Sequence, residues 1–403
     1  MSKLERLIQQ YCPDGVEYVK LGNICNIKGR IGFRGYTRDD QVKEGEGALS
    51  LSPSNIQNGQ MDYTKGTFIS WKKYNESPEI ITYDGDIIFC KTASVGKVAL
   101  VKNLPYAATI NPQLVVLKDI KCNAPFLTYV LGTDAFQKKV ISMAGVGSVP
   151  NIPQKSLADL EIPVPPLPVQ EEIVRILDTF TGLQAGLQAE LQKRQQQYNF
   201  YRDNLLNFNR GGQEIKWMKL KEIGKVCMCK RILKEQTVSS GDVPFYKIGT
   251  FGGVADAHIP QELFDSYKSK FSYPQKGDIL ISAAGTIGRT VEFDGKPAYF
   301  QDSNIVWLKH DESIVLNSYL KYCYTQNPWA ISTGGTIARL YNDNILNATI
   351  PVPPIVEQQK IVAILDRFDT LTNDLTSGLP AEMKKRRQQY EYYRDRLLTF
   401  KRL

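Results

Sequence analysis

The chain has 403 residues, of which 42% are hydrophobic and 23% are charged, so it is long enough for two folded domains and is not a disordered chain. Lysine and arginine number 50 against 42 aspartate and glutamate residues, an excess that favours an acidic partner such as nucleic acid without specifying one. The seven cysteines form no CxxC pair and only His258 and His310 are histidines, which indicates buried reduced thiols and no metal site.

The first residues, MSKLERLIQQY, predict a short N-terminal helix over residues 2–11. This segment places charges within its apolar pattern and lacks the apolar core of a signal peptide or a membrane span. We therefore expect a cytoplasmic protein with no membrane partner.

Residues 1–160 predict a first globule of mixed α and β structure. Short runs such as GDIIF at Gly85 and QLVVLK at Gln113 are bounded by glycine and proline, which is typical of strands. The segment FLTYVLGTDAFQKKVI at Phe126 has helical periodicity.

A second globule, residues 211–348, repeats this order. GDILIS at Gly277 and NIVWLK at Asn304 predict strands, and NSYLKYCYTQ at Asn317 predicts a helix. The repetition indicates a duplicated module.

Each globule is followed by a helical region, residues 161–210 or 349–403. Both regions begin with IPVPP, at Ile162 and Ile350, and end with QQYNFYRDNLLNF or QQYEYYRDRLLTF. The prolines predict an extended entry, and the periodicity that follows predicts a long helix. Two such helices most simply pack against each other, so we expect an antiparallel intramolecular coiled coil that joins two α/β domains.

A stripe of apolar and aromatic residues recurs every three or four positions along both helices. Gly182 and Gly186 should weaken the first helix, and Gly378 with Pro380 should kink or interrupt the second. The predicted seam consists of Ile173, Leu177, Phe180, Leu187, Leu191, Tyr198, Tyr201 and Leu205 in the first helix and Ile361, Leu365, Phe368, Leu375, Tyr390, Tyr393 and Leu397 in the second.

The second copy of the helical region is four residues longer than the first, and the first contains the tetrad series LQAGLQAELQKR at Leu183. Four residues add about one helical turn, or about 6 Å, and nearly preserve the leucine face. The series is either a spacer that sets the separation of the globules or ordinary helix-forming sequence.

The N-terminal KLERLIQQYCPDG and the internal YRDNLLNFNRGG each place a short helical pattern before a glycine turn and a first strand. The start of the chain thus supplies a helix end like the one that precedes the second globule. We expect the N-terminal segment to pack near the C-terminal end of the second long helix.

Basic residues gather in glycine-rich loops at matching places in the two globules. Arginine and lysine neutralise phosphates or contact guanine, and glycine permits close approach of the backbone. The candidate DNA-binding residues are Lys28, Arg30, Arg34, Arg38, Lys91, Lys97, Ser148, Lys230, Arg231, Lys247, Arg289, Arg339 and Tyr341.

No catalytic motif is evident. GDIIFCKT lacks the glycine that precedes the lysine of a phosphate-binding loop, and INPQ and QNPW lack the second proline of the amino-methyltransferase turn. Two alternatives to a non-catalytic DNA-binding protein remain. One is an enzyme, such as a fused methyltransferase–nuclease, and the other is a coiled-coil scaffold that does not bind DNA.

The pattern IPVPPxxxQxxIVxILDxF followed by a helix ending YxxYRDxLLxF, present twice, resembles the specificity (S) subunit of type I restriction–modification enzymes. The segment GDILIS…GTIGR is also similar to what is usual in the recognition domains of this family. KTASVGK, in the first globule, departs from that turn. A related type IIB or IIG-like specificity subunit is the alternative within the family.

The resemblance implies a non-catalytic subunit in which each globule binds one half of a bipartite double-stranded DNA sequence and the helices set the gap. It implies as partners two methyltransferase (M) subunits and two restriction/translocase (R) subunits. No cofactor is expected in this chain, because S-adenosylmethionine, ATP and magnesium are used by those partners.

Overall fold

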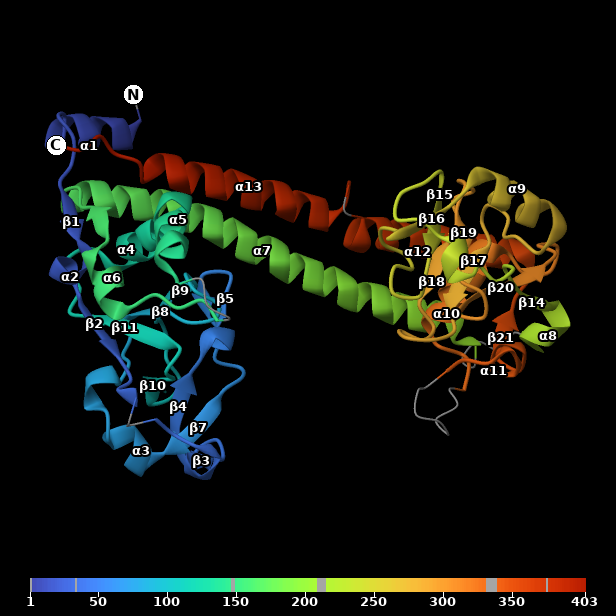
Figure 1. The fold of residues 1–403 in the computed structure, drawn as a ribbon, viewed down its shortest axis with the longest axis horizontal. Helices are drawn as coiled ribbons and strands as arrows, with labels where there is room; N and C mark the ends of the chain where they lie inside the picture. Colours follow the sequence, from blue (N-terminus) through green and yellow to red (C-terminus); the bar gives the residue numbers. More distant parts are fainter. Residues whose placement is uncertain (1, 33–34, 146–148, 209–214, 331–338, 375) are drawn as a thin grey trace. The chain divides into compact units, whose positions relative to one another are not determined.

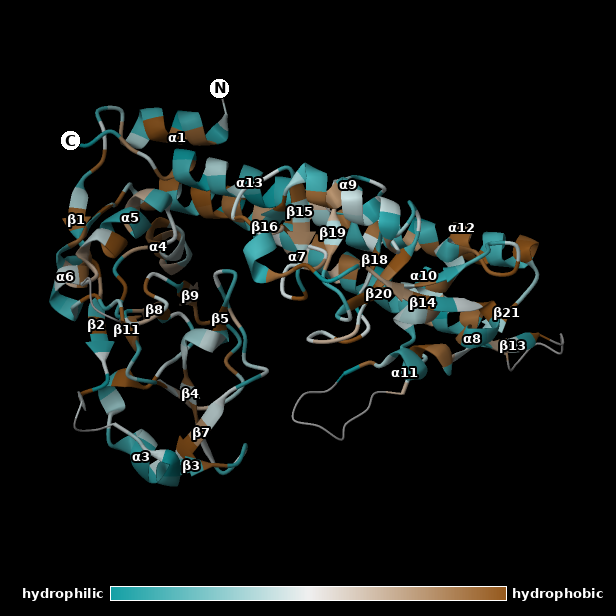
Figure 2. Cartoon of the chain, turned by 45° about the vertical axis from the view of Figure 1, so that its right-hand side comes forward, coloured by the Kyte–Doolittle hydropathy of each residue, from teal (hydrophilic) through white to brown (hydrophobic). Residues whose placement is uncertain are grey.

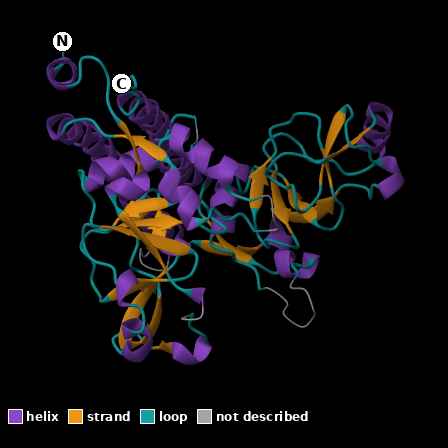
Figure 3. Cartoon of the chain, turned by 60° about the vertical axis from the view of Figure 1, so that its left-hand side comes forward, coloured by secondary structure: helices purple, strands orange, loops and turns teal. Residues whose placement is uncertain are grey.

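The computed structural model describes residues 2–32, 35–145, 149–208, 215–330, 339–374 and 376–403 (Figure 1). The chain divides into two compact units. Unit 1 comprises Met1–Gln188 and Glu382–Leu403, and unit 2 comprises Ala189–Ala381. Each unit combines helices with strands (Figure 3), as the sequence predicts.

The described residues of unit 1 form two four-stranded sheets and two small two-stranded ones. Their orders are β2-β11-β8-β9, β10-β4-β7-β3, β1-β12 and β5-β6. The strands are β1 (Tyr18–Lys20), β2 (Asn26–Gly29), β3 (Gln41–Val42), β4 (Gly47–Leu51), β5 (Ile56–Gln57), β6 (Gln60–Met61), β7 (Thr67–Ser70), β8 (Ile87–Cys90), β9 (Val98–Leu100), β10 (Ala108–Ile110), β11 (Leu114–Lys118) and β12 (Glu161–Pro163). The helices are α1 (Lys3–Tyr11), α2 (Leu21–Ile24), α3 (Trp71–Asn75), α4 (Ala124–Leu131), α5 (Asp134–Met143) and α6 (Gln154–Asp159).

The antiparallel β2-β11-β8-β9 sheet, called the central sheet of unit 1, separates two hydrophobic clusters. Along β8, Ile87 and Phe89 belong to one cluster, and Ile88 and Cys90 belong to the other. Successive side chains of a strand point to opposite faces, so a strand buried on both faces is apolar throughout. This explains why GDIIF has no polar alternation.

Unit 2 repeats the arrangement with a central sheet of order β14-β20-β17-β18, together with the sheets β16-β15-β19 and β13-β21. The strands are β13 (Lys216–Lys219), β14 (Gly224–Met228), β15 (Val243–Tyr246), β16 (Ala257–Ile259), β17 (Ile279–Ser282), β18 (Thr290–Glu292), β19 (Tyr299–Phe300), β20 (Ile305–His310) and β21 (Thr349–Val352). The helices outside the long helical regions are α8 (Leu220–Ile223), α9 (Gln261–Lys270), α10 (Asn317–Thr325) and α11 (Asn342–Leu346).

The first helical region is one unbroken helix, α7 (Leu167–Leu206), whereas the second is divided into α12 (Ile355–Asn373) and α13 (Leu379–Leu397). The break predicted at Gly378 and Pro380 is thus confirmed. Gly182 and Gly186 do not interrupt α7, and a Cβ atom added at either would meet nothing within 4 Å. None of the helices among the described residues has the length and apolar character that a bilayer crossing requires.

The two helical regions pair in both units, and the order of their contacts along the chain confirms that they run antiparallel. In unit 1, Phe180 near the start of α7 stacks on Tyr393 near the end of α13, with ring centroids 5.4 Å apart. In unit 2, Tyr201 near the end of α7 stacks on Phe368 of α12 at 5.3 Å. Increasing residue numbers along α7 therefore pair with decreasing residue numbers along the second region, so the two run antiparallel.

The predicted seam also packs against the globules. Ile173 and Leu177 are fully buried in the main cluster of unit 1, and Leu365 is fully buried in the main cluster of unit 2. The prediction missed Leu206, which is 1% exposed, and Leu375 lies outside the described residues. Each helical region thus packs against both the other helix and a globule. The predicted helix–helix seam accounts for only the first of these contacts.

The glutamine of IPVPPxxxQ joins each helix to its globule. Gln358 is fully buried, accepts a hydrogen bond from the Leu316 backbone N–H at 2.9 Å, and donates to the carbonyls of Ile314 and Pro353 at 2.9 and 2.8 Å. Gln170 makes the matching contacts in unit 1, accepting from a backbone N–H at 2.9 Å and donating to a carbonyl at 2.6 Å. These bonds connect the proline turn, the start of the helix and the start of α4 or α10.

The aspartate of ILDxF makes a second connection. Tyr129 of α4 donates to Asp178 of α7 at 2.5 Å, and Tyr322 of α10 donates to Asp366 of α12. Burial is the main cause that raises the pKa of both tyrosines, so their hydroxyl groups stay protonated as donors. The repeated motif is therefore a docking surface between a helix and its own globule.

The N-terminal segment packs beside the C-terminal residues of the chain in unit 1, as predicted (Figure 1). The backbone N–H of Val16 donates to the carbonyl of Lys401 at 2.9 Å, and the Tyr18 hydroxyl donates to the carbonyl of Phe400 at 3.1 Å. Helix α1 carries both hydrophobic and hydrophilic residues (Figure 2), and it buries Leu4 in the same cluster as Leu398.

Candidate nucleic-acid interface

In unit 2, three segments that the sequence singled out meet at one edge of the central sheet. Strand β14 ends at Met228, just before the predicted Lys230 and Arg231, and β17 ends at Ser282, which pairs with Ile305 at the start of β20. The backbone N–H of Leu340 donates to the carbonyl of Ala283 at 2.8 Å and brings the segment after residue 338 to the same edge. Antiparallel pairing thus collects loops that are more than 100 residues apart in sequence.

The turn between β17 and β18, residues 283–289, is held by its own hydrogen bonds. Gly285 and Gly288 have positive φ angles of 65° and 79°, a conformation that glycine adopts without steric cost. The Gly288 N–H donates to the carbonyl of Ser282 at 2.9 Å. The Ser282 hydroxyl accepts from the Arg289 N–H at 3.0 Å and donates to the Thr286 carbonyl. The turn therefore presents its outer side chains from a defined backbone.

The turn between β8 and β9 in unit 1, residues 91–97, has the same backbone shape although its sequence is KTASVGK. Ala93 has a φ of 64° and Gly96 a φ of 93°, and the Gly96 N–H donates to the carbonyl of Cys90 at 2.9 Å. A left-handed conformation costs an alanine about 1–2 kcal/mol. The surrounding structure of unit 1 therefore imposes the shape that glycine permits in unit 2.

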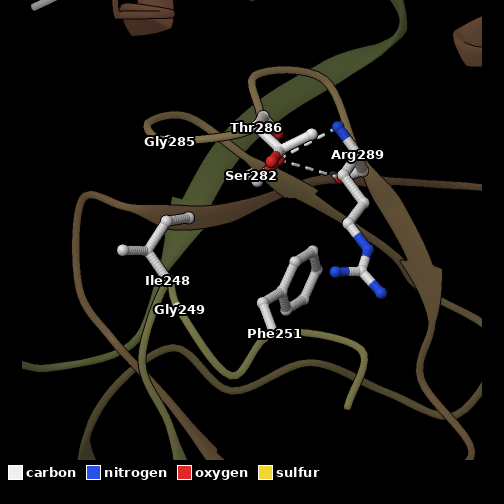
Figure 4. A pocket seen from close by; sticks show the side chains of 7 residues that line it. All are labelled: Ile248, Gly249, Phe251, Ser282, Gly285, Thr286 and Arg289. Carbon is white, nitrogen blue, oxygen red and sulfur yellow. Dashed lines mark hydrogen bonds between the residues drawn. The ribbon is translucent and has the colours of Figure 1, made fainter. Parts of the chain in front are cut away.

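A recess lies beside the β17–β18 turn (Figure 4). It has a volume of about 190 Å³ and is lined by Ile248, Gly249, Phe251, Ser282, Gly285, Thr286 and Arg289. The Arg289 guanidinium donates through Nη2 to the carbonyl of Gly252 at 3.2 Å, which links the turn to the loop after β15. The recess thus combines apolar side walls with a cationic group and a hydroxyl-bearing turn.

Unit 1 repeats the link from turn to loop. The Lys97 ammonium donates to the carbonyl of Pro53, in the loop after β4, at 3.4 Å. Lys97 occupies the position of Arg289, and Lys91 occupies the position of Ala283. The two units therefore present different side chains from one backbone frame.

Arg30 does not belong to an exposed interface. It is 6% exposed and donates to the carbonyl of Ile110 at 3.0 Å and to the hydroxyl of Thr109 at 3.1 Å. Burial lowers the pKa of its guanidinium from the usual value. We leave Arg30 out of the proposed DNA contacts because its side chain is held inside unit 1.

The remaining candidates of unit 1 lie at separate places. Lys28 is exposed on β2, and Arg38 is exposed at the start of the short helix Arg38–Asp40. Arg34 and Ser148 lie outside the described residues. The structure therefore brings Lys91 and Lys97 together in one turn and places Lys28 and Arg38 elsewhere.

Two candidates of unit 2 have carboxylate partners. Arg231 lies 2.9 Å from Asp302, and Lys247 lies 2.8 Å from Asp256. The side chains of Arg231 and Lys247 are 67% and 41% exposed, and exposed pairs of this kind contribute about 0–1 kcal/mol. A phosphate group can therefore compete for either cation at low cost.

The other candidates of unit 2 surround the same sheet edge. Arg339 donates to the carbonyl of Ser303 at 2.8 Å, just before β20. Lys230 is exposed after β14, with its ammonium 5.2 Å from the centroid of the Phe271 ring, and Tyr341 is 56% exposed. These residues lie in the loops that border the turn.

Thr286, Ile248 and Phe251 are not among the DNA-binding residues predicted from the sequence. Ile248 and Phe251 are uncharged residues that follow the predicted Lys247, and the contact of their loop with the turn joins residues more than 30 positions apart. A residue-by-residue comparison of the two turns would have identified Thr286, which stands where unit 1 has Ser94.

A protein-family model described as the type I restriction modification DNA specificity domain matches residues 13–193 and again residues 213–385. The chain belongs to this family. It contains the specificity domain twice, and these matches account for the duplication in the sequence.

Two relatives of known sequence are both named as type I restriction enzyme specificity subunits. A type I restriction enzyme specificity subunit predicted in Haemophilus influenzae is 55% identical over 252 residues, covering 60% of this chain and 65% of that protein. The type I restriction enzyme EcoR124I/EcoR124II specificity subunit of Escherichia coli is 37% identical over 270 residues, covering 62% of each. The matches thus span somewhat less than two thirds of the length of these relatives.

Solved structures share the fold of this specificity-domain protein. A chain from a study of complex assembly in the type I R-M system aligns with a TM-score of 0.58 at 18% identity, covering 96% of this chain and 98% of that one. The type I S subunit from M. genitalium aligns with a TM-score of 0.52 at 15% identity, covering 96% and 97%.

Proposed function

We propose that this chain is the non-catalytic DNA-specificity subunit of a type I restriction–modification enzyme and that each unit binds one half of a bipartite sequence. The presence of two specificity domains in one chain carries this proposal. Each unit has a turn of the same backbone shape at the same edge of its central sheet, with different side chains on it. Two domains that recognise different half-sequences need this combination of a shared backbone and different contact side chains.

The net charge of +8 and the exposed cations near these turns suit a polyanionic ligand. Duplex DNA is favoured over a small anion because the cations are spread over several loops of each unit. Contacts to many phosphates would supply affinity, and contacts from the turns would supply sequence preference.

The proposed complex contains two methyltransferase and two restriction/translocase subunits and acts in the cytoplasm. In it, S-adenosylmethionine, ATP and magnesium serve the partner subunits. This chain would supply the DNA contacts and a surface on which the partners assemble.

The repeated helical motif supports the docking of two identical partners. In QQYNFYRDNLLNF and its copy, Tyr201 and Tyr393 stack on aromatic rings of the opposite helical region within their own units. Phe200 and the equivalent Tyr392 instead remain 63% and 58% exposed. Exposed aromatic side chains at equivalent positions of a repeat are suited to binding two copies of one partner.

Replacing both Phe200 and Tyr392 by alanine should weaken assembly with the methyltransferase subunit about 10- to 100-fold per site, because buried aromatic anchors contribute about 2 kcal/mol each. Mass photometry of mixtures over a range of concentrations would measure the effect. Tyr11→Ala, which removes an aromatic side chain that is 45% exposed on α1, is the matched control. Equal assembly of the double variant and the control would exclude these residues from the interface.

DNA binding itself is tested with the complex of this chain and its methyltransferase. Fluorescence anisotropy with duplexes containing the methylated motif should show an affinity that falls at least 100-fold between about 50 and 200 mM salt, because phosphate contacts release counterions. Binding that is absent, or that does not respond to salt, would contradict the proposal.

A further inference from the structure

The two β-turns of the units share a backbone frame but differ in the charged side chain at its end. Arg289 closes the β17–β18 turn and Lys97 closes the β8–β9 turn, and both reach a carbonyl of the neighbouring loop. Ala93 keeps the left-handed conformation that Gly285 has in the other unit. The shape of the turn is thus maintained in unit 1 even where its residue does not favour it, which is typical of a backbone that positions functional groups.

The environment of Arg289 suits recognition of a flat hydrogen-bonding surface. One donor of Nη2 is directed to the Gly252 carbonyl, which restrains the plane of the guanidinium, and Ile248 and Phe251 line the sides of the recess (Figure 4). A guanidinium has five N–H donors, so others remain for a ligand. A restrained guanidinium can donate two parallel hydrogen bonds to O6 and N7 of guanine in the major groove.

A contact to a DNA phosphate needs less precise positioning of the cation than a contact to a base edge does. An exposed cation is sufficient for a phosphate, and Lys230, whose side chain is exposed and does not line the recess, is a cation of that kind. Arg289 differs because it is tied to a second loop and lies next to the exposed Thr286, whose methyl and hydroxyl groups are also able to contact base edges.

We infer that Arg289 is a specificity-determining residue that contacts a guanine in the half-sequence bound by unit 2, and that Lys97 has the same role in unit 1. This inference rests on the proposed function, because it assigns roles within a DNA contact. It also predicts that each half-sequence contains at least one G·C pair on which discrimination depends.

The experiment compares the wild-type complex with complexes carrying Arg289→Ala, Arg289→Lys or Lys230→Ala, each with the partner methyltransferase. The readout is selection of bound duplexes from a library randomised over both half-sequences, together with the methylation motif in cells. For Arg289→Ala we expect about 10- to 100-fold less discrimination at one G·C position in one half-sequence, with the other half unchanged. Arg289→Lys should retain part of it, because lysine also contacts guanine O6 and N7.

Lys230→Ala is the matched control and should weaken all sequences alike. Lys97→Ala should relax one G·C position in the opposite half-sequence, which provides a second variant if Arg289→Ala fails to fold. Uniform weakening by Arg289→Ala, or an unchanged motif in both variants, would overturn the inference while leaving DNA binding by the wild type intact. Failure of the wild-type complex to select any sequence would instead contradict the proposed function.

Discussion

Gln358→Leu should lower the free energy of unfolding of unit 2 by about 3–5 kcal/mol. The substitution leaves three backbone groups without their partner, and each unsatisfied buried polar group costs about 1–3 kcal/mol. The substitution keeps most of the side-chain volume and removes three hydrogen bonds of a fully buried group. The backbone N–H of Leu316 and the carbonyls of Ile314 and Pro353 would lose these partners. The loss should therefore exceed that of an ordinary core substitution.

Tryptophan fluorescence during urea unfolding would measure this change. Trp217, Trp307 and Trp329 belong to unit 2 and only Trp71 belongs to unit 1, so the signal reports mainly on unit 2. Gln192→Leu, at an exposed position of α7 in the same unit, is the matched control. Similar unfolding midpoints for the two variants would show that the buried glutamine does not hold the helix to its globule.

Deletion of Leu187–Glu190 should shorten the tolerated gap between the two half-sequences by about two base pairs. The deletion removes one turn of the continuous helix α7, or about 6 Å, and stacked base pairs are spaced by about 3.4 Å. Four residues correspond to about 400° of helical rotation, so the faces of α7 on either side remain nearly in register. Binding to the original site should fall at least 100-fold, because the two half-sites no longer fit simultaneously.

The motif methylated by the deletion variant in cells would report both half-sequences and the gap. Leu187→Ala, which keeps the length of α7, is the control and should leave the gap unchanged. A deletion variant that keeps the original gap, or that changes the half-sequences themselves, would show that α7 does not set the spacing.

The sequence was most informative about the repeated helical regions. Proline and glycine act locally, so the break before Leu379 could be predicted from Gly378 and Pro380 alone. Gly182 and Gly186 had less effect than their propensity indicates, because packing of α7 against its neighbours in each unit outweighs the local preference. The periodic stripe identified the packed side of each helix but not its division between a helix and a globule.

The candidate site was less predictable. The burial of Arg30 depends on Thr109 and Ile110, which are about 80 residues away. The partners Asp302 and Asp256 of the predicted cations likewise come from other strands and loops. Such contacts are set by strand pairing and cannot be inferred from local pattern.

The equivalence of the two turns illustrates the same limit. KTASVGK differs from the turn of unit 2, and no local pattern in it predicts the left-handed conformation that Ala93 adopts. That conformation depends on the matching hydrogen bonds around Cys90 and Ser282. Backbone frames of this kind are visible only when the two units are compared in three dimensions.

The methylation pattern of DNA from cells that express this chain with its methyltransferase tests the central claim most directly. We predict one motif of two unlike half-sequences separated by a fixed unspecified gap, and we predict that exchanging residues 283–289 for the residues of turn 91–97 alters only one half. A continuous motif, or a pattern of methylation that is the same without this chain, would contradict the account.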